Sequence, residues 1–144
     1  MKSITTVFKD YYPSGIYYLH TGEHPEDLAT QVEAFDFCFF YLDGKRIGSA
    51  FEFADEVIPA MNFPDMGNTW DAFLDRLREL DQWCPGKKGY VLVYDWHKHF
   101  LESDAEHFGY FMDVVKDACK FFDEKTETPF YMFFRASAYL PVAE

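Results

Sequence analysis

The sequence predicts an α/β fold, with a small, mainly parallel sheet of three to four strands packed with helices. Strand-like apolar runs alternate along the chain with segments of helical periodicity, which is typical of parallel strands joined by crossover helices. The runs at 37–42 and 90–94 are almost continuously apolar, as expected for strands covered on both faces. A length of 144 residues with 49% apolar residues predicts one domain, 1–144, with a substantial core.

The predicted strands are rich in aromatic and β-branched residues and are bounded by turn-forming residues. They occupy 15–20, 37–42, 90–94 and 129–134. Asp43 and Gly44 form a turn after the second run. Residues 1–14 show no such pattern and are predicted to be loosely ordered.

The predicted helices begin at local start signals. Ser49 and Glu52 form a capping box, and Pro25 suits a first helical turn. Pro59 comes late in the second helix and is expected to kink or end it. The helices begin near Pro25, Ser49, Asn68 or Thr69, and Ser103 or Asp104, and they end near Ala34, Met61, Leu80 and Phe122.

The third helix combines an acidic face with an apolar face. Asp71 and Asp75 are four residues apart and therefore project together from a helix. The apolar face consists of Trp70, Phe73, Leu74, Leu77 and Leu80. Two carboxylates held side by side can imitate the phosphates of a nucleic acid, although a merely solvated helix face is the simpler alternative.

The charge of the chain favours a basic protein partner. Lys and Arg number 13 and Asp and Glu 25, so the formal net charge is −12. Such a chain repels phosphate backbones, which disfavours direct nucleic-acid binding, although acidity can also serve solubility alone. No apolar run approaches the length of a membrane span, and the first residues lack the apolar core of a secretion signal. We therefore expect a cytoplasmic protein.

The cysteines and histidines indicate neither a disulfide framework nor a metal site. Cys38, Cys84 and Cys119 are odd in number and widely spaced, which fits a reducing cytoplasm with Cys38 and Cys119 as core residues. His97 and His99 would share a face of a strand and could bind zinc, but further ligands are lacking. Surface histidines in a loop are the simpler interpretation.

An enzyme is the remaining alternative. Asp71 and Asp75 could act as an acid/base pair in a hydrolase. The chain has no Gly-rich phosphate loop, no nucleophile elbow and no Cys-His signature. We therefore predict that the protein is not an enzyme and needs no cofactor and no metal.

The order of these motifs resembles the barstar family of intracellular ribonuclease inhibitors. The likeness rests on the Asp43-Gly44 turn, on Phe63-Pro64, on the segment from Gly67 to Leu77, and on the strand that follows at 90–93. It covers residues 37–135. Residues 1–36 resemble the strand and helix that extend longer barstar-like proteins at their N-terminus.

The resemblance implies a mode of action. Barstar proteins press an acidic helix and its neighbouring loop into the active site of a basic ribonuclease. The partner-binding residues that we predict are Asp65, Asn68, Asp71, Leu74, Asp75, Glu79 and Asp117. Asp75 matches the acid that reaches the phosphate-binding groups of the ribonuclease, and Asp117 matches a further acidic contact.

The chain departs from the family pattern at three positions. Met66 stands where the family often has Tyr or Phe, and Thr69 stands where it often has Asn. Asp65 replaces a tyrosine that packs on the enzyme in the family's prototype, which implies an altered partner surface. Our interpretation is an inhibitor, monomeric when free, of a basic ribonuclease or nuclease toxin. A non-inhibitory adaptor of the same fold is the alternative.

Overall fold

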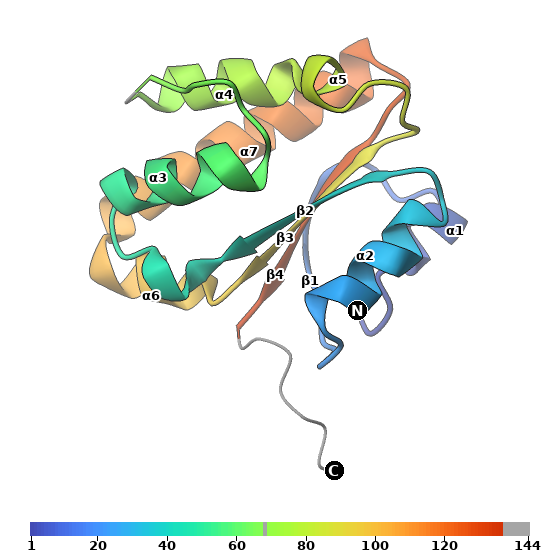
Figure 1. Ribbon diagram of the computed structural model, residues 1–144, viewed down its shortest axis with the longest axis horizontal. Helices are drawn as coiled ribbons and strands as arrows, with labels where there is room; N and C mark the ends of the chain where they lie inside the picture. Colours follow the sequence, from blue (N-terminus) through green and yellow to red (C-terminus); the bar gives the residue numbers. More distant parts are fainter. Residues whose placement is uncertain (68, 137–144) are drawn as a thin grey trace.

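A single all-parallel sheet organises the protein. The computed structural model describes residues 1–67 and 69–136. The strands within this part are β1 (Gly15–Tyr18), β2 (Cys38–Asp43), β3 (Tyr90–Asp95) and β4 (Phe130–Arg135). They lie in the order β1-β4-β3-β2, and every neighbouring pair is parallel (Figure 1). The predicted α/β fold with a small parallel sheet is confirmed.

Helices cover both faces of the sheet. They are α1 (Thr6–Lys9), α2 (Pro25–Glu33), α3 (Ala50–Ala60), α4 (Trp70–Arg78), α5 (Leu80–Trp83), α6 (His97–Ser103) and α7 (Ala105–Lys125), with a 3-10 turn at Gly44–Arg46. In Figure 1, α1 and α2 lie on one face and the other helices on the opposite face. None of the helices within the described ranges is long and apolar enough to cross a bilayer.

The central strands β3 and β4 divide the core into two clusters. Every residue of both strands is buried, and successive side chains point to opposite faces. Leu92 and Met132 join the larger cluster with the helices from α3 to α7, whereas Val91 and Phe133 join the smaller cluster with α1 and α2. The expectation that the run at 90–94 is covered on both faces is therefore confirmed.

Side-chain caps begin the helices where the sequence predicts them. Ser49 Oγ accepts a hydrogen bond from Glu52 N at 3.1 Å, and the Glu52 carboxylate accepts one from Gly48 N at 2.9 Å. Asp104 caps α7 by accepting from His107 N at 3.3 Å. These bonds satisfy amide groups that have no partner inside the helix, so the capping interpretation is confirmed.

The prediction of a loosely ordered N-terminus is wrong. Residues 6–9 form α1, and Ile4, Val7 and Phe8 are buried in the smaller core cluster. The Tyr131 hydroxyl also donates to the carbonyl oxygen of Tyr12 at 2.6 Å. A short helix of this kind is stabilised by distant partners, so its own sequence shows little periodicity.

The interpretation of the segment after β3 is also wrong. Residues 97–103 form α6 rather than a loop. His97 is buried and stacks on Phe134 with ring centroids 4.2 Å apart, whereas His99 is exposed. The two histidines therefore do not share a face. Among the described residues, no group of three or more His, Cys, Asp or Glu side chains could hold a metal ion.

A disulfide joins Cys38 and Cys84, contrary to the expectation of reduced thiols. The two residues are 46 positions apart in sequence, and their Cα atoms are 6.6 Å apart, within the range that a disulfide can span. The bond ties the segment after α5 to the start of β2. Cys119, by contrast, is free and buried as predicted, and burial raises the pKa of its thiol to about 12.

Candidate partner-binding surface

Helix α4 holds its acidic face on a rigid support. Thr69 Oγ1 accepts a hydrogen bond from Ala72 N at 3.1 Å and so caps the helix. Phe73 and Leu77 are fully buried, and α4 packs along α7. On the outer side, Asp71 and Asp75 are exposed one turn apart, as their spacing predicts. No ion pair between described residues involves either carboxylate.

Arg76 neutralises two other acids that we predicted to bind the partner. Its Nη2 atom lies 3.0 Å from Asp65 Oδ1, and its Nη1 atom lies 2.9 Å from Glu79 Oε1. Arg76 Nε also donates to the carbonyl oxygen of Asp65 at 2.8 Å. The bonds to Asp65 and Glu79 raise the pKa of Arg76. The loop before α4 is thereby fastened to the helix, and Asp65 and Glu79 are less available to a partner than Asp71 and Asp75.

The remaining predicted residues differ in their surroundings. Asp117 is exposed on α7, beside a shallow hollow lined also by Arg78, Lys120 and Lys125, so its surroundings carry both signs of charge. Leu74 is half-buried against the larger core cluster. Asn68 lies outside the described residues. The acids that the structure brings together without a neutralising cation are therefore Asp71 and Asp75.

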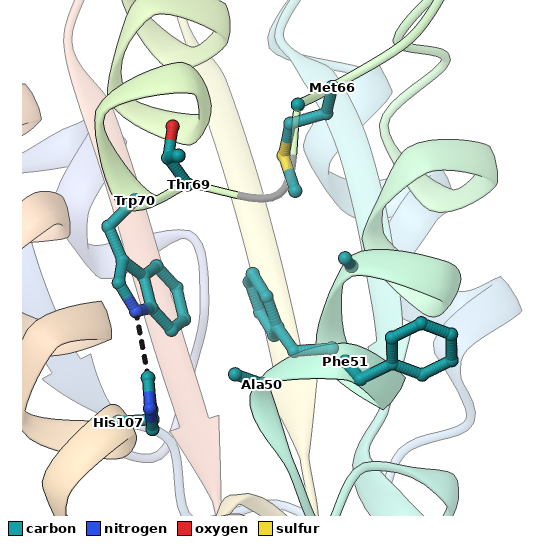
Figure 2. Close-up of a pocket in the computed structure, with 9 residues that line it drawn as sticks. Ala50, Phe51, Met66, Thr69, Trp70 and His107 are labelled. Carbon is teal, nitrogen blue, oxygen red and sulfur yellow. Dashed lines mark hydrogen bonds between the residues drawn. The ribbon is translucent and has the colours of Figure 1, made fainter.

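A pocket beside the start of α4 was not predicted from the sequence. It has a volume of about 250 Å³ and opens between α3 and the loop that leads into α4. Its walls are Ala50, Phe51, Phe53, Ala54, Met66, Gly67, Thr69, Trp70 and His107. Figure 2 shows Met66 and Trp70 facing the α3 residues across this space. The capping box places Phe51 in the first turn of α3, but only the fold brings Met66 and Trp70 opposite that turn.

The comparison with family models agrees with this arrangement. Residues 37–135 match the model described as Barstar (barnase inhibitor). This protein belongs to the barstar family. A comparison with curated proteins found no match. Members of the barstar family are inhibitors and not enzymes, and the family implies a barnase-like ribonuclease as partner.

The barstar match begins just before β2 and ends with β4. It therefore includes α3, α4 and α7, which carry the acidic face and the pocket, whereas α1, β1 and α2 precede it. Nevertheless β1 pairs with β4 in the same sheet, from Gly15 opposite Tyr131 to Tyr18 opposite Phe134. The N-terminal extension thus completes one edge of the sheet that supports the barstar region.

A buried ion pair at the end of β3 was also missed from the sequence. Asp95 is fully buried and receives hydrogen bonds from Arg135 Nε at 2.6 Å and Nη2 at 2.8 Å. The Tyr41 hydroxyl donates to the same carboxylate at 2.7 Å. Arg135 further donates to the carbonyl oxygens of Thr21 and Glu23. These bonds link β2, β3, β4 and the segment before α2, so Asp95 has a structural task.

Proposed function

We propose that this protein inhibits a basic ribonuclease or nuclease toxin by placing the acidic face of α4 in the active site of that enzyme. The single observation that carries this proposal is the pair Asp71 and Asp75, exposed on a capped and packed helix with no ion-pair partner among the described residues. Family membership supports it independently, because the barstar family implies a barnase-like ribonuclease as partner.

The chemistry of the two carboxylates suits a site that binds phosphates. They would accept charge-assisted hydrogen bonds from Arg, Lys or protonated His, with two parallel bonds wherever Arg is available. Because α4 is already fixed by its cap and its buried face, binding would cost little ordering entropy. Inhibition would be steric, since the helix would occupy the groove that RNA requires.

The net charge supports rapid capture of such an enzyme. A chain of net charge −12 attracts a basic protein over long distances, which raises the association rate at low salt. The same charge repels RNA itself, so we propose no direct contact with nucleic acid. We also propose that the free protein is monomeric and cytoplasmic, although a disulfide such as Cys38–Cys84 is rare in that compartment. We further propose that 1–36 and 37–135 form one domain, because β1 pairs within the common sheet.

The partly neutralised loop favours a second candidate. Arg76 pairs with Asp65 and Glu79, and Arg78 lies over the ring of Phe121 at 5.5 Å, so cations interrupt the acidic surface. A partner other than a ribonuclease would be compatible with such a mixed surface. The alternative is therefore an adaptor of the barstar fold that binds a basic protein without inhibiting a nuclease.

Inhibition of a small basic ribonuclease of the barnase type tests the proposal. The purified protein is titrated into the enzyme at low and at physiological ionic strength, and the initial rate of RNA cleavage is measured. We expect stoichiometric inhibition, with an association rate that falls as salt rises. Unchanged RNA cleavage at both ionic strengths, with excess folded protein, would favour the adaptor.

A further inference from the structure

On the basis of the proposed function, we propose that the pocket beside the start of α4 receives an apolar side chain, flanked by Lys or Arg, from the basic partner. The interface would then extend from the acidic face of α4 onto α3. The occupant is an anchoring side chain of another protein and not a free small molecule.

The size and lining of the pocket support a side-chain occupant. Its volume of about 250 Å³ lies below the range of roughly 300–1,000 Å³ that is usual for small-molecule sites. Most of the lining residues are apolar, and the largest apolar side chains among them are those of Phe51, Phe53, Met66 and Trp70. An aromatic or large aliphatic side chain would bury apolar surface here, which is the usual role of an interface anchor.

The wall formed by Trp70 is already ordered. Trp70 Nε1 donates a hydrogen bond to His107 Nδ1 at 3.1 Å, which Figure 2 marks with a dashed line. The rings of Trp70 and Phe53 lie 5.4 Å apart. The indole therefore has both its polar atom and one side of its ring engaged, so the pocket needs little rearrangement to accept a partner.

Phe51 extends the apolar lining of the pocket onto the protein surface. Its side chain is 73% exposed, whereas Phe53, two residues later on α3, is fully buried. Covering such an exposed phenylalanine with a partner removes apolar surface from water, which favours binding. Aromatic residues are also enriched at protein interfaces. Phe51 thus provides contact area at the rim for the partner that fills the pocket.

The charges around the pocket indicate what flanks the occupant. Every charged residue directly next in sequence to a lining residue is acidic, namely Glu52, Asp55, Asp65, Asp71 and Glu106. Glu52 is used in the cap of α3, and Asp65 is paired with Arg76. Asp55, Asp71 and Glu106 are exposed one residue away from the lining, so cations that flank the occupant on the partner would meet an acidic surface. A second copy of this chain would instead bring acids against acids.

Two tripeptides test the pocket without any nuclease. We would record the methyl NMR signals of Met66 and Ala54 while adding acetyl-Arg-Phe-Arg-amide or acetyl-Asp-Phe-Asp-amide. We expect saturable shifts with the Arg peptide at millimolar concentration and at least about tenfold weaker binding of the Asp peptide, because like charges repel. Equal binding of both peptides, or no shift with either, would overturn the proposal.

Two variants test the pocket in the complex with a barnase-type ribonuclease. Ala54→Trp fills the pocket, and Phe51→Ala removes the exposed ring without altering buried groups. Leu101→Ala, which truncates a 40% exposed side chain on α6, is the control. We expect the Kd to rise about tenfold in Ala54→Trp, less in Phe51→Ala, and not at all in the control.

The outcomes for the pocket and for the proposed function are separable. An unchanged Kd in both pocket variants would overturn the proposal that the partner fills the pocket, even if the Arg peptide binds. If the unaltered protein does not inhibit the ribonuclease, the proposed function is contradicted for that enzyme. The peptide titration then tests by itself whether the pocket binds an apolar side chain flanked by cations. We expect Ala54→Trp to abolish the shift of the Met66 methyl signal.

Discussion

Asp95 and Asp75 are both carboxylates of the barstar region, yet their surroundings are opposite. Asp95 is fully buried and bonded to Arg135 and Tyr41, whereas Asp75 is exposed on α4 and has no ion-pair partner among the described residues. The first charge is already compensated inside the fold, and the second is available to another molecule. Net charge alone therefore does not reveal which acids can bind a partner.

Removal of the buried carboxylate is expected to have the largest effect on stability. Asp95→Ala would leave the guanidinium of Arg135 buried without its counter-charge, at a cost of about 3–5 kcal/mol in the free energy of unfolding. Urea unfolding measures this loss. Asp113→Ala, at an exposed position of α7, is the control and should change stability by no more than about 0.5 kcal/mol. Equal losses of stability in the two variants would contradict the claim that the buried Asp95 carboxylate stabilises the fold more than an exposed one.

The disulfide is expected to be the next largest contribution. It closes a segment of 46 residues that contains α3 and α4, so Cys84→Ser should lower the free energy of unfolding by roughly 2–4 kcal/mol. Cys119→Ser is not a suitable control because that thiol is buried. Addition of a reductant to the unaltered protein is the better control, and it should reproduce the loss. A reductant without effect would show that the cross-link does not stabilise the fold.

Thiol labelling tests which cysteines form the disulfide and which one is buried and free. With its pKa raised to about 12 by burial, Cys119 stays protonated and unreactive at pH 8 in the folded protein. Fast labelling after reduction should therefore modify Cys38 and Cys84 and spare Cys119 until the protein unfolds. Mass mapping of the labelled peptides measures this order.

A smaller effect is expected at the start of the acidic helix. Thr69→Ala removes the hydroxyl that accepts from Ala72 N and should cost about 1 kcal/mol of stability. Thr69→Ser retains a hydroxyl and should behave like the unaltered protein. If the cap positions Asp71, the Ala variant will also bind a ribonuclease less tightly than the Ser variant. Identical unfolding curves for both variants would show that the cap is dispensable.

The smallest effect is expected at Asp65. This carboxylate is already paired with Arg76 on the protein surface, and exposed ion pairs contribute little. Asp65→Ala should change the Kd for a ribonuclease by less than about fivefold, measured by inhibition titration. A loss as large as that in Asp75→Asn would mean that Asp65 leaves Arg76 in the complex and contacts the partner directly.

Features encoded by neighbouring residues could be predicted from the sequence. The strands were recognisable from their apolar runs, and the Ser49–Glu52 capping box and the Thr69 cap depend on residues three positions apart. The shared exposure of Asp71 and Asp75 follows from helical spacing in the same way. The family resemblance was also confirmed over residues 37–135.

Features that depend on distant residues were missed. Helix α1 is held by Tyr131 and the smaller core cluster, and the Cys38–Cys84 bond joins residues far apart in sequence. The pairing of Arg76 with Asp65 depends on the loop folding back onto α4, so the sequence does not show that Asp65 is neutralised. The structural role of Asp95 was missed because its partner Arg135 lies on another strand.

The most direct test of the central claim compares two variants that lose the same single charge. Asp75→Asn alters the acidic face of α4, and Glu33→Gln alters an exposed residue of α2 on the opposite face of the sheet. The Kd for a barnase-type ribonuclease is measured at physiological ionic strength, with urea unfolding to confirm equal stability. We predict that Asp75→Asn weakens binding at least about thirtyfold, while Glu33→Gln changes it little. A thirtyfold change corresponds to the usual threshold of about 2 kcal/mol for an interface hot spot, for which a barstar residue is itself one of the known examples. Equal Kd values for the two variants would contradict the account, because binding would then depend on net charge and not on the acidic helix.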